Sequence, residues 1–134
     1  MKALTISQPF ASLIASGEKW IENRRWATSY RGDLAIHAGK GLQYLSKGEL
    51  AQYPSGGVIA IARLTACVTF VDIASMTLYV KRKKVIPGTN RFWSEAYQHR
   101  YAEGPWCWIL EDVRPCDIVA VQGKQGLWEF TKGP

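Results

Sequence analysis

Cysteine is scarce in this chain of 134 residues, with three in all and no CxxC pair. An odd number of cysteines without paired spacing argues against a disulfide framework and favours reduced thiols. Together with His37 and His99 they match none of the spacings typical of a zinc site. We therefore expect no metal. The three positions are Cys67, Cys107 and Cys116.

Other absences narrow the class of protein. There is no signal peptide and no apolar run long enough to cross a membrane, so we expect a soluble intracellular, cytoplasmic protein. The sequence contains no Walker A loop, dinucleotide fingerprint, HExxH motif or Ser-His-Asp arrangement, and we expect no cofactor. Without repeats, low-complexity segments or linkers, residues 1–134 are expected to form a single domain. The oligomeric state stays open.

Positive charge and aromatic side chains are abundant instead. The formal net charge is +6, and the chain has six tryptophans. This combination favours a polyanionic partner, either RNA, DNA or a phosphorylated ligand. The alternative is a basic protein whose charge serves solubility alone.

The apolar pattern predicts many short strands and few helices. Residues 57–70 give the strongest strand, with β-branched residues and apolar side chains on both faces. Further strands are expected at 3–6, 19–24, 34–38, 106–113, 117–121 and 127–130, with short helices at 8–16, 42–53 and 90–99. Strands in this number and spacing favour an α+β fold. We expect a small, closed or nearly closed mixed β-barrel with short helices flanking a cleft at its mouth.

Local signals mark several element boundaries. Ser7 is expected to cap the first helix, and Gly17 is expected to end it in a left-handed conformation. The strand at 34–38 alternates as if half-buried, and Pro115 is expected to start a turn between two strands. The charge run Lys81-Arg82-Lys83-Lys84 predicts either a solvated loop or a patch that contacts phosphates.

A dense group of charged and aromatic residues follows the first expected helix. Glu22 and Arg24 share one face of a strand and can pair. The carboxylate would then read a base edge, act as a general base, or only form a structural ion pair. Two interpretations of Lys19 stay open. It contacts a phosphate, or it is desolvated in a cleft and works as a base or nucleophile.

Flat side chains accompany this charge. Trp26, Tyr30 and Arg31 suit stacking on an unpaired base, although Trp26 could equally close the edge of the barrel. His37 lies between apolar neighbours, which is more typical of a core or rim histidine than of a catalyst.

Near the end of the chain, the segment Gly123–Gly126 places Lys124 and Gln125 on a tight turn that could bind an anion or read a base edge. The candidate nucleic-acid-binding residues are Gln8, Lys19, Arg24, Trp26, Tyr30, Arg31, His37, Lys40, Lys124 and Gln125. The candidate catalytic residues, if the chain is an enzyme, are Lys19 and Glu22.

Four motifs together resemble one known family. They are SQPFASLIASGEKWIENRRW, YRGDLAIHAGK, EGPWCWILEDVRP and GKQGLWEF. The combination is similar to the ASCH domain, the activating signal cointegrator homology domain of the PUA-like superfamily. The match covers both ends of the chain, and residues 72–100 look like a variable insertion.

The resemblance implies a PUA-like β-barrel with a helix-lined cleft and a role in RNA or DNA recognition. Some small bacterial members are amidohydrolases that deacetylate N(4)-acetylcytidine, and others have been described as ribonucleases. The amidohydrolase motif GxKxxTxR uses its Lys and Thr in catalysis together with a distant Glu. Here Lys19 and Arg24 match, but Glu22 replaces the Thr. The form with Glu resembles the cointegrator-like branch, which favours a nucleic-acid-binding module over a hydrolase acting on RNA or a modified nucleoside.

Overall fold

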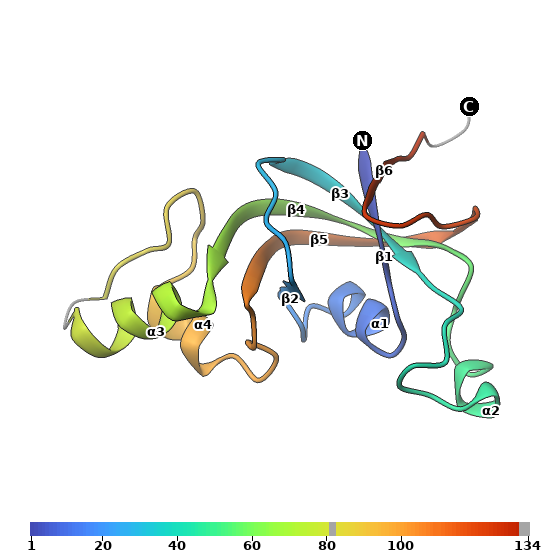
Figure 1. Cartoon of the computed structure of the whole chain (residues 1–134). Coiled ribbons are helices and arrows are strands. Elements are labelled where there is room, and N and C mark those ends of the chain that lie inside the picture. The colour runs from blue at the N-terminus through green and yellow to red at the C-terminus, as the bar shows by residue number, and fades with distance from the viewer. Residues whose placement is uncertain (81–82, 132–134) are drawn as a thin grey trace. The chain divides into compact units, whose positions relative to one another are not determined.

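The computed structural model describes residues 1–80 and 83–131. Its strands are β1 (Lys2–Ile6), β2 (Ile21–Arg24), β3 (Gly32–Ala38), β4 (Gly57–Thr69), β5 (Trp106–Ala120) and β6 (Leu127–Glu129). Its helices are α1 (Phe10–Ala15), α2 (Lys47–Leu50), α3 (Phe70–Tyr79) and α4 (Trp93–Gln98) (Figure 1). The strands pair in the order β2-β5-β4-β3-β1-β6. The predicted α+β fold, with short helices around a mixed sheet, is confirmed.

The chain divides into two compact units. The first contains the described residues of 1–19, 33–63 and 112–131, and the second contains those of 20–32 and 64–111. Both β4 and β5 contribute residues to each unit.

The sheet of the first unit is built around β1. This strand pairs in parallel with β3 and antiparallel with β6, and the N-terminus lies beside β6 (Figure 1). The N–H of Phe130 donates to the carbonyl of Met1 at 2.8 Å. Residues 34–38 were predicted to be half-buried, which is wrong, because every one of them is buried. A central strand with a parallel partner is commonly covered on both faces.

Helix α1 begins with a different cap from the one expected. The side chain of Ser7 does not cap it. Instead, the Oε1 of Gln8 accepts a hydrogen bond from the backbone N–H of Ser12 at 2.9 Å. The end of the helix agrees with the prediction, since Gly17 has φ +86° and its N–H donates to the carbonyl of Ile14. Such a left-handed glycine satisfies carbonyls that the last turn leaves unpaired.

The second unit contains a helix that the sequence pattern did not reveal. Helix α3 follows β4 directly, and its first turn is capped by Thr69, whose Oγ1 accepts from the N–H of Asp72. Ile73 of this helix is fully buried in the core of the second unit. In α4 the residues Trp93 and Ala96 are buried, whereas 37% of Tyr97 is exposed.

One strand stands where two were predicted. β5 runs without a break from Trp106 to Ala120, so Pro115 starts no turn. The backbone irregularity lies at Asp112 instead, with φ +51°. Aspartate enters this left-handed region more readily than most residues, so the sequence carries no strong signal for it.

Three smaller expectations concern exposed groups and thiols. The cysteines are free, as expected. Lys83 and Lys84 are exposed, whereas Lys81 and Arg82 lie outside the described residues. None of the helices in 1–80 and 83–131 is long and apolar enough to cross a membrane.

Candidate functional site

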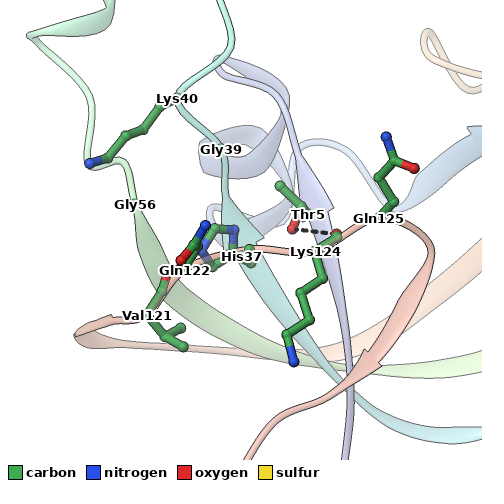
Figure 2. Close-up of a pocket in the computed structure, with 10 residues that line it drawn as sticks. Thr5, His37, Gly39, Lys40, Gly56, Val121, Gln122, Lys124 and Gln125 are labelled. Atoms are coloured by element: carbon green, nitrogen blue, oxygen red, sulfur yellow. Dashed lines mark hydrogen bonds between the residues drawn. The ribbon is translucent and has the colours of Figure 1, made fainter.

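A hollow of about 830 Å³ opens in the first unit (Figure 2). Its size falls in the range of sites that hold small ligands or a single nucleotide. Four of the predicted residues meet here, namely His37, Lys40, Lys124 and Gln125. The full lining is Thr5, His37, Gly39, Lys40, Gly56, Val121, Gln122, Gly123, Lys124 and Gln125.

Backbone pairing brings distant segments together at this pocket. The parallel register of β1 and β3 sets Thr5 opposite His37. Beyond the end of β3, the N–H of Gly56 donates to the carbonyl of Ala38 at 2.7 Å. The carbonyl of Gly56 accepts from the N–H of Val121 at 3.2 Å. The Gly56 peptide therefore joins the end of β3 to the segment that follows β5.

His37 lies almost wholly inside the protein, with 2% of it exposed. Its Nε2 donates to the carbonyl oxygen of Val121 at 2.7 Å, since a carbonyl oxygen can only accept. Its Nδ1 is inaccessible to solvent and has no hydrogen-bond partner among the described residues. The sequence pattern predicted a core or rim histidine with its hydrogen bonds satisfied, and the structure satisfies one of its two nitrogens.

Gly123 packs directly against this histidine. A Cβ at this position would lie 2.6 Å from Thr5 Oγ1, 2.7 Å from His37 Cε1 and 2.9 Å from His37 Nδ1. Real Cβ atoms essentially never approach so closely. Glycine is therefore required here because the backbone passes so close to Thr5 and His37, a reason that the sequence does not show.

The two lysines of the pocket are both exposed. The stem of Lys40 passes over Gly56, where a Cβ would lie 2.5 Å from Lys40 Cε. Lys124 follows Gly123, and its carbonyl accepts a long hydrogen bond of 3.4 Å from Thr5 Oγ1. In Figure 2 the side chain of Lys40 lies on one side of His37 and that of Lys124 on the other. Positive charge thus flanks the buried histidine on two sides.

Two predicted residues of the first unit are absent from the pocket lining. Gln8 is fully buried, and its Nε2 donates to the carbonyl of Pro54 at 2.8 Å and to Ser12 Oγ at 2.9 Å. Its amide is thus engaged within the protein. Lys19 is 3% exposed, and its Nζ lies 5.8 Å from the centre of the Phe10 ring.

Glu22 and Arg24 belong to the second unit and form the ion pair that their spacing predicted. Arg24 Nε and Nη2 lie 3.0 and 2.9 Å from Glu22 Oε2. Glu22 is 7% exposed. A carboxylate so little exposed is stable mainly because it is paired, and removing one partner of a buried pair is costly.

The aromatic loop of the second unit is held by its own backbone. Arg31 Nη1 donates to the carbonyls of Thr28 and Tyr30, each at 2.8 Å. The carbonyl of Trp26 accepts from Trp108 Nε1 at 3.2 Å, and the two indole rings meet edge to face at 4.8 Å. Trp26 nevertheless remains 38% exposed, so part of its ring faces solvent.

Sequence reasoning missed half of the pocket. Thr5, Gly39, Gly56, Val121 and Gln122 were not among the candidates. Thr5 could have been found only from its register with His37, and Val121 only from its hydrogen bond to that ring. Both are contacts between residues far apart in the sequence.

Comparison with known proteins now gives the family. The family model of the ASCH domain matches residues 4–119. The chain belongs to the ASCH domain family. This confirms the resemblance drawn from its four motifs, of which three lie within that range and the fourth, at residues 123–130, lies beyond it.

Solved structures of ASCH proteins share the fold. The ASCH protein from Zymomonas mobilis superposes with a TM-score of 0.58 at 19% identity, covering 98% of this chain and 87% of that one. Crystal structures of two point mutants of the same protein give TM-scores of 0.58 and 0.57, also at 19% identity. They cover 98% of this chain and 90% and 88% of theirs. No curated protein matches the sequence.

Proposed function

We propose that this ASCH chain is a nucleic-acid-binding module and that the pocket of its first unit holds an unpaired nucleotide of RNA or DNA. The observation that carries the proposal is the pairing of Lys40 and Lys124 with the buried ring of His37 and the side chains of Gln122 and Gln125 in one hollow. Ammonium groups attract phosphates, while amides and an imidazole suit base edges.

The placement of the lysines favours a strand over a free nucleotide. Because Lys40 and Lys124 lie on either side of His37, each can meet a different phosphate. A strand that crosses the pocket offers a phosphate on each side of a base, which matches this separation. The net charge of +6 adds attraction at longer range.

The second unit offers a separate stacking surface. Trp26 is partly exposed and its backbone carbonyl is held by Trp108, and Arg31, five residues further along the chain, is exposed. Base–aromatic stacking tolerates any sequence, because every base has a flat face. We assign Trp26, with Tyr30, to stacking on the bases of a single strand and Arg31 to the phosphates beside those bases.

Binding of labelled oligonucleotides tests this proposal. Fluorescence anisotropy would be measured for single- and double-stranded RNA and DNA at a low and a high salt concentration, and the same samples would be analysed for cleavage. The proposal predicts binding to single strands that weakens steeply with salt and leaves the strand intact. Affinity that does not respond to salt, or no affinity for any of the four, would overturn it.

A second candidate function is hydrolysis of RNA or of a modified nucleoside such as N(4)-acetylcytidine. The observation in its favour is the burial of Lys19, at 3% exposure, because lysines that act as bases or nucleophiles are typically desolvated. Lys19 would serve as the base in this reaction.

Turnover by matched lysine variants separates the two functions. Lys19→Ala is expected to abolish hydrolysis, while Lys47→Ala on the exposed helix α2 leaves it unchanged. Equal activity in Lys19→Ala and the parent protein, or no turnover in the parent, would remove this candidate. Thermal unfolding of both variants checks that the buried change leaves the protein folded.

A further inference from the structure

The hydrogen bonding of His37 fixes which of its nitrogens carries the proton. Nε2 donates to the carbonyl oxygen of Val121 at 2.7 Å, so Nε2 bears hydrogen. In the neutral ring Nδ1 then carries a lone pair and can only accept. The pocket therefore contains a fixed acceptor whose orientation is set by the bond on the far side of the ring.

This acceptor is left without a partner. Nδ1 is inaccessible to solvent and has no hydrogen bond among the described residues. Most buried polar atoms in proteins are paired, and an unpaired one is costly and calls for an explanation. The nearby Thr5 Oγ1 donates to the Lys124 carbonyl and accepts from Trp128 Nε1 instead.

We infer that His37 determines specificity by accepting, at Nδ1, an N–H from the base that enters the pocket. This inference rests on the proposed function and deepens it. It assigns the pocket to a base that presents a hydrogen-bond donor, with its flanking phosphates on Lys40 and Lys124. Val121 acts as a positioning residue, because its carbonyl holds the ring in the tautomer that can accept.

The segment Gln122–Gly126 has to shift for the base to reach Nδ1, because Gly123 packs against that atom. Its sequence suits such a shift. It has glycine at 123 and 126, and Lys124 and Gln125 are exposed. The hydrogen bond from Thr5 to the Lys124 carbonyl is long, at 3.4 Å. The N–H of the base would replace Gly123 as the neighbour of the ring and pair the buried nitrogen.

Removing single N–H groups from the base tests the inference in the unmodified protein. Short single-stranded RNAs would carry one central base in two forms, with and without one Watson–Crick donor. The pairs are adenine and purine, cytosine and 2-pyrimidinone, uracil and 3-methyluracil, and guanine with either hypoxanthine or 1-methylguanine. For at least one pair, losing the donor is expected to weaken binding about fivefold or more, the effect of one buried unpaired group.

Two variants of His37 identify the acceptor. His37→Gln can keep the donor to the Val121 carbonyl but lacks the acceptor at Nδ1, so the affinity ratio within the sensitive pair is expected to fall to about one. His37→Asn places an amide oxygen near the Nδ1 position and is expected to retain part of the ratio. The methylated bases could also bind more weakly because the added methyl group is bulky. A loss of affinity with that cause would persist in His37→Gln.

The imidazole signals provide a readout that does not depend on any variant being stable. The chain has two histidines, so the ¹⁵N resonances of their rings can be assigned by comparison. Binding of the RNA with the donor is expected to shift the Nδ1 resonance of His37, and binding of the donor-free RNA is expected to shift it less.

The outcomes separate this inference from the proposed function. Salt-sensitive binding with a ratio near one for every pair overturns the inference and leaves the function standing. A donor preference that persists in a folded His37→Gln protein also overturns it, because another group must then read the base. No binding to any strand overturns both.

Discussion

Neutralising the two pocket lysines should change the salt dependence of binding by a calculable amount. Lys40 and Lys124 are exposed on opposite sides of His37, and each is expected to meet one phosphate. For single strands, log K falls with log salt by about 0.7 for each phosphate neutralised. Lys40→Gln or Lys124→Gln should therefore make the slope shallower by about 0.7, and the double variant by about 1.4.

The same relation gives the loss of affinity. Between about 1 M and about 0.1 M salt, one phosphate contact contributes about 0.7 logarithmic units, which is about fivefold or about 1 kcal/mol. Each single variant should lose about fivefold at the lower salt, and the double variant about 25-fold. At the higher salt the variants and the parent protein should converge.

The assay is a titration of a labelled single strand, followed by anisotropy at several salt concentrations. Lys47→Gln provides the matched control, because it removes the same charge from the exposed helix α2 of the same unit and does not line the pocket. Lys40 and Lys124 do not bind phosphates if Lys47→Gln changes the slope as much as the pocket variants do, or if the slope of the double variant equals that of the parent protein.

Three further predictions concern other parts of the chain. Trp26→Ala should weaken single-strand binding by about 1–3 kcal/mol while leaving double-strand binding unchanged, and equal losses for both in the anisotropy assay would argue against stacking. In Gly17→Ala the new Cβ has free space, but the alanine must adopt φ +86°. Urea unfolding should therefore show a free energy of unfolding lower by about 1–2 kcal/mol. The matched change Gly48→Ala, inside helix α2, should be neutral or stabilising. The hydrogen bond from the Phe92 N–H, more than the nearby Arg91, lowers the pKa of Glu95 from its usual 4.5. Its contribution to stability is therefore present above about pH 4.5 and lost as the pH falls, and urea unfolding of Glu95→Gln should depend less on pH in that range.

Local patterns were enough to predict several elements. The β-branched run from residue 57 gave β4 nearly to its last residue, because a strand buried on both faces needs such a composition. The Glu22–Arg24 ion pair followed from a spacing of two on one strand. Gly17 marked the end of α1, since few other residues adopt its backbone conformation.

Other features depend on contacts that no local pattern encodes. Helix α3 was missed because the apolar run of β4 continues into it, and the cap at Thr69 does not stand out within that run. The backbone irregularity that was predicted at Pro115 lies at Asp112 instead, where φ is positive. The pocket forms through the pairing of β1 with β3 and the close packing of Gly123 on His37. Sequence patterns predicted its two lysines but not these long-range contacts.

The central claim is that a nucleic-acid strand occupies the pocket of the first unit. The most direct measurement is a titration of ¹⁵N-labelled protein with an unlabelled single strand, followed by the backbone amide signals. If the strand occupies this pocket, the largest shifts are expected on Gly39, Gly56 and Gly123, with little change on helix α2. Shifts confined to residues outside the pocket, at concentrations where the strand is bound, would contradict it.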